Sequence, residues 1–155
     1  RPPRSTLFPY TTLFRSISGK FENNYAKTES TDSGMGAFGG AISNNATIKS
    51  IDNSVFKNNF AISSNNVENM ALGGAIYTKK DLIINANNGL TEFTGNYVSS
   101  DGGTTKRYEA ICVNATGKTL TLNATAHGTI LLNDYINGVN GYNVLLKGDS
   151  NSVIK

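Results

Sequence analysis

The sequence contains a single cysteine, Cys112, so no disulfide within the chain can stabilise its fold. Charged residues are also scarce: they make up 16% of the chain, against roughly a quarter in typical soluble globular domains. No stretch approaches the roughly 18 consecutive apolar residues that a membrane-spanning helix requires. We therefore expect neither a disulfide framework nor direct insertion of this segment into a membrane.

The formal net charge of +3 belongs to the start of the chain. Residues 1–16 contain Arg1, Arg4 and Arg15 and no acidic residue, so the rest of the sequence has no net charge. An excess of basic residues often indicates a nucleic-acid or anionic-surface partner. Because the excess is confined to this short leader, we expect no nucleic-acid partner.

The leader differs in character from everything that follows. Its stretch TLFPYTTLFRS, from Thr6 to Ser16, is interrupted by Pro9 and by polar residues, so it lacks the apolar run of a signal peptide. Back-translated with one choice of codons, it matches a common short-read sequencing adapter. We therefore interpret residues 1–16 as an artefactual, disordered leader fused to a genuine coding fragment, residues 17–155.

Two short motifs recur through residues 21–114 with a period of about 35 residues, which is typical of solenoid repeats. One is Phe-x-x-Asn followed by an aromatic and a small apolar residue, and the other is Gly-Gly-Ala-Ile. Tyr108-Glu109-Ala110-Ile111 is a degenerate third copy of the second motif. The repeat residues are Phe21, Asn24, Gly39, Gly40, Ala41, Ile42, Phe56, Asn59, Gly73, Gly74, Ala75, Ile76, Phe93 and Asn96.

A third apolar segment separates the two motifs in each period, as in Ala46–Ile51 and Asp81–Asn85. All three segments are short, rich in β-formers and bounded by Asn or Gly turns, and no window has a sustained helical period. The pattern predicts an all-β fold, a right-handed parallel β-helix (solenoid) with about three strands per rung.

Stacking of rungs gives each repeated residue an expected place, because equivalent positions lie about 4.8 Å apart on neighbouring rungs. The three Phe residues should form a column inside the solenoid. The three Asn residues should lie at a corner, where their amides can hydrogen-bond along the stack and tolerate a left-handed backbone. The Gly pair should allow a tight bend, and the Ala and Ile residues that follow it should form further columns.

The pattern changes over residues 118–155, where short strands follow one another without a long loop. We expect strands at 120–123, 129–132, 143–146 and 152–154, in tighter rungs. Since the last strand-like run reaches Ile154 without a polar cap, we expect the natural protein to continue past Lys155.

The interleaved Gly-Gly-Ala-Ile and Phe-x-x-Asn motifs resemble the passenger repeats of polymorphic outer-membrane proteins, a family of bacterial autotransporters (type V secretion). The resemblance covers about Phe21 to Asn114, and the third glycine pair is missing. It implies a passenger exposed at the bacterial cell surface or secreted, carried by a C-terminal β-barrel in the full-length protein. It also implies an adhesin-like or stalk role, with host-cell or neighbouring-cell surface ligands as partners.

We weighed catalytic alternatives on the same scaffold, since some polysaccharide lyases and hydrolases are parallel β-helices. The acidic residues are scattered and do not repeat at equivalent positions, which disfavours an acid/base or Ca²⁺ site. His127 lies in a predicted turn without a second ligand at metal spacing, and Cys112 reads as a small buried hydrophobe. We therefore expect no enzyme activity, no cofactor and no metal.

The alternative reading, a fragment of a carbohydrate-active β-helix enzyme, would be favoured by carboxylates gathered with Lys or Arg in one groove. A solenoid of an unrelated surface-layer protein is a third hypothesis. For the preferred reading, the segments Lys27–Ala37, Ser63–Leu72 and Val98–Tyr108 should project sideways as loops that make the contacts.

Overall fold

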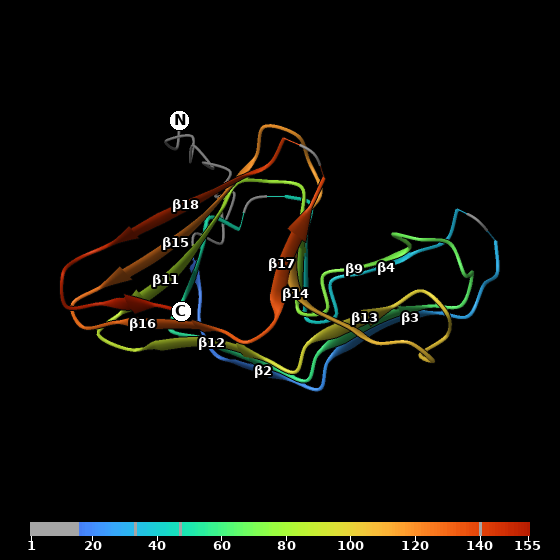
Figure 1. Cartoon of the computed structure of the whole chain (residues 1–155), viewed down its shortest axis with the longest axis horizontal. Coiled ribbons are helices and arrows are strands. Elements are labelled where there is room, and N and C mark those ends of the chain that lie inside the picture. The colour runs from blue at the N-terminus through green and yellow to red at the C-terminus, as the bar shows by residue number, and fades with distance from the viewer. Residues whose placement is uncertain (1–15, 33, 47, 140) are drawn as a thin grey trace, which may run out of the picture.

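The computed structural model describes residues 16–32, 34–46, 48–139 and 141–155, and all regular structure in these ranges is β-strand. Parallel strands stack coil upon coil (Figure 1), so the predicted β-solenoid is confirmed. Residues 1–15 of the predicted leader lie outside the described residues, and Ser16 is the first residue of β1.

Three sheets form the walls of the solenoid. The first contains, in spatial order, β1 (Ser16–Ile17), β6 (Ser50–Asp52), β11 (Leu82–Asn87), β15 (Thr119–Thr125) and β18 (Asn143–Gly148). The second contains β2 (Lys20–Glu22), β7 (Val55–Lys57), β12 (Leu90–Thr94), β16 (Thr129–Leu132) and β19 (Val153–Ile154). The third runs β3 (Tyr25–Thr28), β8 (Phe60–Ser63), β13 (Tyr97–Ser99), β14 (Arg107–Val113), β10 (Ile76–Thr78) and β5 (Ile42–Asn44), and β17 (Tyr135–Gly138) pairs with β14.

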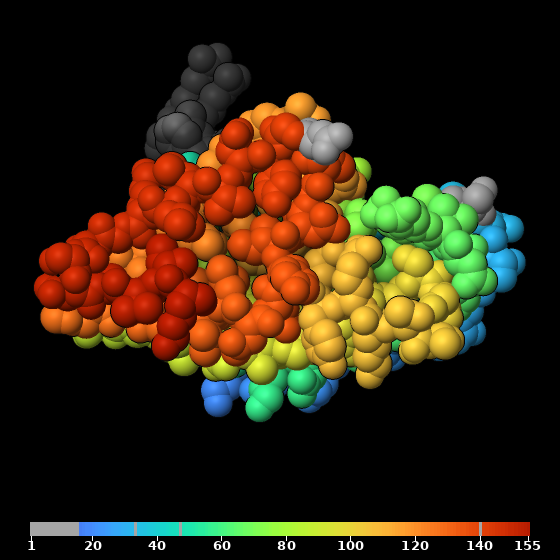
Figure 2. Space-filling view, in the orientation of Figure 1, coloured from blue at the N-terminus to red at the C-terminus, as the bar shows by residue number. Residues whose placement is uncertain are grey.

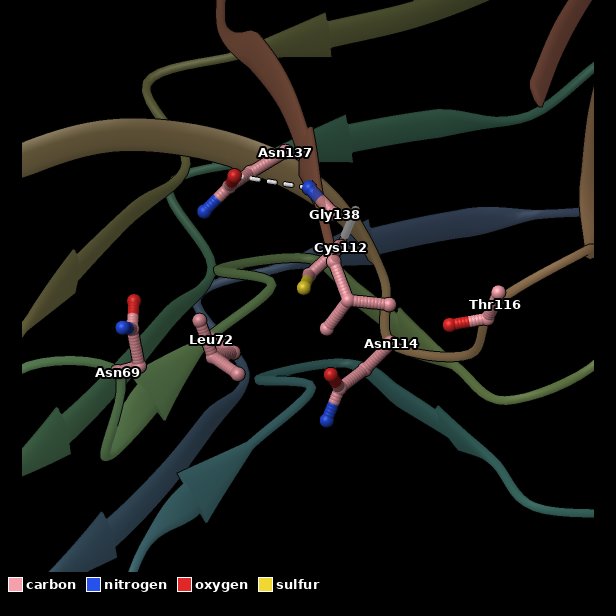
Figure 3. Close-up of a pocket in the computed structure, with 8 residues that line it drawn as sticks. Asn69, Leu72, Cys112, Asn114, Thr116, Asn137 and Gly138 are labelled. Carbon is pink, nitrogen blue, oxygen red and sulfur yellow. Dashed lines mark hydrogen bonds between the residues drawn. The ribbon is translucent and has the colours of Figure 1, made fainter. Parts of the chain in front are cut away.

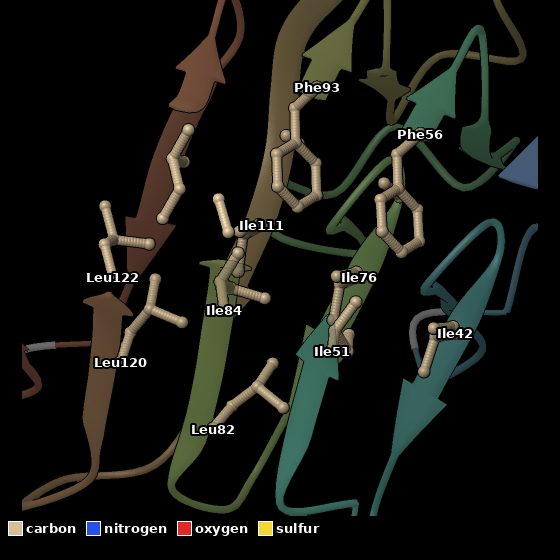
Figure 4. Close-up of a cluster of buried hydrophobic side chains, with 14 of the residues drawn as sticks. Ile42, Ile51, Phe56, Ile76, Leu82, Ile84, Phe93, Ile111, Leu120 and Leu122 are labelled. Atoms are coloured by element: carbon tan, nitrogen blue, oxygen red, sulfur yellow. The ribbon is translucent and has the colours of Figure 1, made fainter. Parts of the chain in front are cut away.

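Columns of similar side chains fill the interior. The rings of Phe21, Phe56 and Phe93 stack with centroids 4.6 and 4.8 Å apart and nearly parallel planes, which confirms the predicted column. Figure 4 shows Phe56 and Phe93 beside isoleucines and leucines of neighbouring coils. Ile42, Ile76 and Ile111 are direct register partners, as predicted. Each such buried side chain stabilises the fold by about 1.5–3 kcal/mol.

The segments predicted to be projecting loops do leave the solenoid to one side, and short strands border them at both ends. β3, β8 and β13 form one layer, and β4 (Ala37–Phe38) and β9 (Ala71–Leu72) form a second, and the two extend to one side of the solenoid (Figure 1). We call this projection, residues 25–38, 60–72 and 97–107, the lateral arm. A cluster of small buried side chains, Ala37, Ala61, Ala71 and Val98, lies in the arm.

The loop prediction therefore holds for most of these segments, and pairing between coils turns only their ends into strands. Residues 29–36, 64–70 and 100–106, which make up most of the predicted loops, connect the arm's strands. In the third coil the connection is short, and β13 and β14 pair antiparallel through Tyr97–Tyr108 and Val98–Arg107. This antiparallel hairpin was not anticipated by the parallel pattern.

The predicted strands of residues 118–155 are confirmed as β15, β16, β18 and β19. The strand β17, which no pattern predicted, completes the fourth coil by pairing with β14. The fourth coil passes from β16 to β17 through only two residues, 133 and 134, and so adds nothing to the lateral arm.

Candidate functional site

The repeated asparagines form a buried hydrogen-bonded ladder at one corner of the solenoid. Oδ1 of Asn59 accepts hydrogen bonds from the backbone N–H and from Nδ2 of Asn24, both at 3.0 Å. Asn59 in turn donates from its backbone and its Nδ2 to Oδ1 of Asn96, at 3.0 and 2.8 Å. The predicted amide stack is thus confirmed, and its role is structural.

The left-handed backbone at this corner lies one residue earlier than predicted. Asn23, Asn58 and Gly95 have φ of 57°, 53° and 72°, whereas the ladder asparagines do not have positive φ. At this corner the left-handed turn and the hydrogen bonds along the stack therefore belong to neighbouring residues.

The two glycines of Gly-Gly-Ala-Ile have different functions. Gly39 and Gly73 have φ of 70° and 65°, a conformation that favours glycine, which confirms the tight bend. Gly40 is needed for space, because a Cβ atom there would lie 2.2 Å from the carbonyl oxygen of Gly74. The glycine motif is therefore a device for packing coils closely.

The degenerate third copy brings an acidic side chain into this crowded region. Glu109 is 1% exposed, and its Oε1 accepts the backbone N–H of Gly73 at 2.7 Å. One coil earlier, the equivalent N–H of Gly39 donates to the backbone oxygen of Leu72. The Glu109 carboxylate thus supplies the acceptor that a strand supplies in the preceding coil.

The second oxygen of Glu109 joins the arm to the fourth coil. Oε2 accepts hydrogen bonds from the Arg107 guanidinium at 2.8 Å and from Nδ2 of Asn137 at 2.9 Å. Sequence reasoning missed this cluster because its members lie far apart in the sequence, on β14, on β17 and just after β9. The available signal was the acid at a position that is glycine in the other two copies.

A groove with polar and apolar lining opens over this cluster, where the lateral arm meets the wall of the fourth coil. It consists of three adjoining hollows of about 500, 350 and 410 Å³. The first is lined by Asn69, Leu72, Cys112, Asn114, Thr116 and residues 137–139; the second by Glu68, Asn69, Arg107, Glu109 and residues 135–137; the third by Asn66, Glu68, residues 98–101, Thr105 and Arg107. Figure 3 shows the first hollow, with three asparagines around the Cys112 thiol.

The groove exists because the arm ends before the solenoid does. The first three coils contribute to the arm, and the fourth runs straight from β16 into β17. A step results. The hairpin of residues 100–106 and the loop 64–70 form one side of it, and the wall formed by β17 forms the other. Figure 2 shows the hairpin in gold and the loop in green beside the orange and red of the last coils.

Two acidic side chains of the groove, Asp101 and Glu109, use their oxygens in hydrogen bonds to the protein itself. Hydrogen bonds from the Ser99 hydroxyl and from the backbone N–H of Thr105 keep the pKa of the Asp101 carboxyl well below its usual range. Asp101 therefore caps its own turn as a carboxylate. Glu109 uses both oxygens in the bonds described above. The third acid of the groove, Glu68, is exposed to solvent and does not hold a turn or a strand in this way.

Cys112 was predicted to be a small buried residue and His127 to lie in a turn, and both are found there. Cys112 is 1% exposed, and burial together with the charge of Glu109 raises the pKa of its thiol to about 12. It therefore stays a thiol rather than the thiolate that a nucleophile requires. His127 lies, as predicted, in the turn between β15 and β16, with φ of 66°.

Within the described residues, no group of three or more His, Cys, Asp or Glu side chains is placed to hold a metal ion. In the same part of the chain there is no helix with the length and apolar character needed to cross a membrane.

Comparisons of the chain with protein-family models, with curated proteins and with solved structures gave no match. The class is defined by the fold and the site: a parallel β-solenoid with a lateral arm and a groove at the arm's base.

Proposed function

We propose that the chain is a non-enzymatic, surface-displayed segment of a bacterial autotransporter passenger, with a stalk and adhesin-like role. The observation that carries the proposal is the lateral arm: three successive coils leave the solenoid together and build an ordered projection with a groove at its base. A projection and a groove on a repeat scaffold are suited to contact with ligands on host or neighbouring cells.

The state of the groove's acids supports a binding rather than a catalytic role. A general acid or base must be free to exchange a proton with the substrate, and a glycosidase requires a pair of such carboxyl groups. Glu109 accepts three hydrogen bonds from protein groups, and Asp101 is held as a carboxylate in its turn. Glu68 would then have to act without a partner acid.

One observation favours the second candidate, a fragment of a carbohydrate-active β-helix enzyme. Glu68, Glu109 and Arg107 line the same hollow, which is the kind of carboxylate and arginine grouping that such enzymes use. In that case Glu68 would be the general acid or base of the reaction.

Adhesion of coated beads tests the proposal. Beads carrying the folded chain should be retained on cultured epithelial cells or on bacterial cells several-fold more than beads carrying the heat-unfolded chain. The same chain, incubated with polysaccharides, should release no new reducing ends. Retention equal to the unfolded control would contradict the adhesive role, and release of reducing ends that is lost in Glu68→Gln would favour the enzyme.

A further inference from the structure

The groove at the base of the arm offers both hydrogen-bond donors and acceptors along its length. Its first hollow presents the amides of Asn69, Asn114 and Asn137 (Figure 3). Asn114 is held in place by donating from Nδ2 to the Tyr77 hydroxyl at 2.7 Å. Among the hydrogen bonds of the described residues, the Asn69 side chain and the Asn114 Oδ1 take part in none. An amide that both donates and accepts matches a hydroxyl group, which does the same.

The charge of the lining selects against anions. Glu68, Asp101 and Glu109 contribute three carboxyl groups, and Arg107 is the one basic residue among the lining residues of the three hollows. The Arg107 guanidinium already donates to Glu109. A phosphate, sulfate or uronate would therefore meet a surface of its own sign.

Apolar surface lies at the floor and at the rim of the groove. Leu72 and Cys112 are 6% and 1% exposed and pack with Tyr77 beneath the first hollow. Tyr135, which is 76% exposed, stands in the second hollow at the edge of β17. A pyranose ring has hydroxyl groups around its edge and C–H groups on its faces, so it matches amides beside small apolar patches and an open aromatic ring.

The β9 side of the groove does not accept an extended peptide as an added strand. Strand addition requires an open sheet edge with free N–H and C=O groups. Here the N–H of Gly73, just after β9, is already bonded to Glu109, and Ala71 within β9 is fully buried. The β9 edge is thus closed to a further strand.

We propose that this groove binds a segment of an uncharged oligosaccharide. The proposal rests on the adhesive function above and specifies the ligand class for it. Hydroxyl groups of the sugar bond to the amides of Asn69 and Asn114, and one ring face packs against Tyr135.

Nuclear magnetic resonance titrations of the full chain test this. The neutral probes are cellohexaose, chitohexaose, maltohexaose and mannohexaose, and the anionic probes are hexagalacturonate and a heparin hexasaccharide. At least one neutral probe should shift the side-chain amide signals of Asn69, Asn114 and Asn137, with an affinity that is unchanged by added salt. The anionic probes should leave these signals in place.

A matched pair of substitutions locates the binding. Val139 lines the first hollow and is 36% exposed, and Val144 is 44% exposed on β18, away from the groove. Val139→Trp fills the hollow and should weaken binding by at least about tenfold, whereas Val144→Trp should leave it unchanged. Tyr135→Ala, at an exposed position that costs the fold little, should weaken binding by about threefold to tenfold.

The proposal is overturned if no neutral probe shifts the groove amides, if only the anionic probes do, or if Val139→Trp binds as well as the native chain. Bead adhesion distinguishes this failure from failure of the adhesive function. If coated beads still adhere and Val139→Trp beads adhere equally, the adhesive role stands and the saccharide groove does not.

Discussion

At the residue scale, each ladder position demands a particular balance of donors and acceptors. An asparagine in the middle of the ladder must accept from the coil below and donate to the coil above, which an amide can do and a carboxylate cannot. At the top, Asp134 receives bonds from Nδ2 and the backbone N–H of Asn96 and from the N–H of Gly95, and it has only to accept. A carboxylate fits there because every group facing it is a donor.

The ladder predicts that Asn59→Ala destabilises the protein by about 2–4 kcal/mol. Asn59 is fully buried, and its loss removes the hydrogen bonds that its side chain makes with the Phe21 carbonyl, the Asn24 amide and Oδ1 of Asn96, at about 1–3 kcal/mol for a buried group left without a partner. Oδ1 of Asn96 keeps the bond from the Asn59 backbone N–H. Asn24→Ala is the matched control, because Asn24 holds the same motif position at the exposed end of the ladder, and it should cost less than about 1 kcal/mol. Urea unfolding measures the free energy of unfolding of both variants. Equal decreases would show that burial of the ladder adds no stability.

At the scale of the elements, strands are held in close contact by glycine where two coils meet. The N–H of Gly40 bonds to the carbonyl groups of Gly73 and Gly74, and its Cα approaches the backbone of β8 at Phe60. This contact sets the distance between the solenoid wall and the arm, since β5 begins two residues later.

Gly40→Ala should therefore destabilise the protein by about 1–3 kcal/mol or more, as expected for overpacking against backbone atoms that cannot move independently. Gly34→Ala is the control: no atom lies within 4 Å of a Cβ placed there, so its effect should stay within about 0.5 kcal/mol. The midpoint of thermal unfolding reports both variants. A Gly40→Ala variant as stable as the control would mean that the coils can separate at no cost.

The sequence predicts the elements well where a residue repeats from coil to coil. The Phe column and the Asn ladder could be read from spacing, because stacking places equivalent residues side by side. The arm strands β4 and β9 were not predicted, although Ala37-Phe38 and Ala71-Leu72 repeat at the 34-residue spacing of the Gly pair that follows them. Two residues are too few to show the alternation of a strand, and they become strands only by pairing with each other. The groove was missed for a related reason: it arises where the repeat fails, at Glu109 and in the fourth coil.

At the scale of the whole molecule, each coil is buried only by its two neighbours, so stability should follow position along the stack. The column Leu122–Leu146 illustrates this. The two residues are register partners on β15 and β18, yet Leu122 is 2% exposed and Leu146 is 62% exposed. Identical side chains in one column thus contribute very different amounts of buried surface.

Leu122→Ala should cost about 2–5 kcal/mol, as for a large-to-small change in a core, and Leu146→Ala less than about 1 kcal/mol. Native-state hydrogen exchange distinguishes how the loss spreads. Leu146→Ala should lower amide protection only in β18 and β19, because β15 is still covered by β11. Leu122→Ala should lower protection in β15, β16 and β18 together, since these strands all pack on the residue's coil or on its neighbours. Equal losses of protection throughout the described strands in both variants would instead mean that the coils unfold as one unit, and the nearest-neighbour account of this solenoid would be wrong.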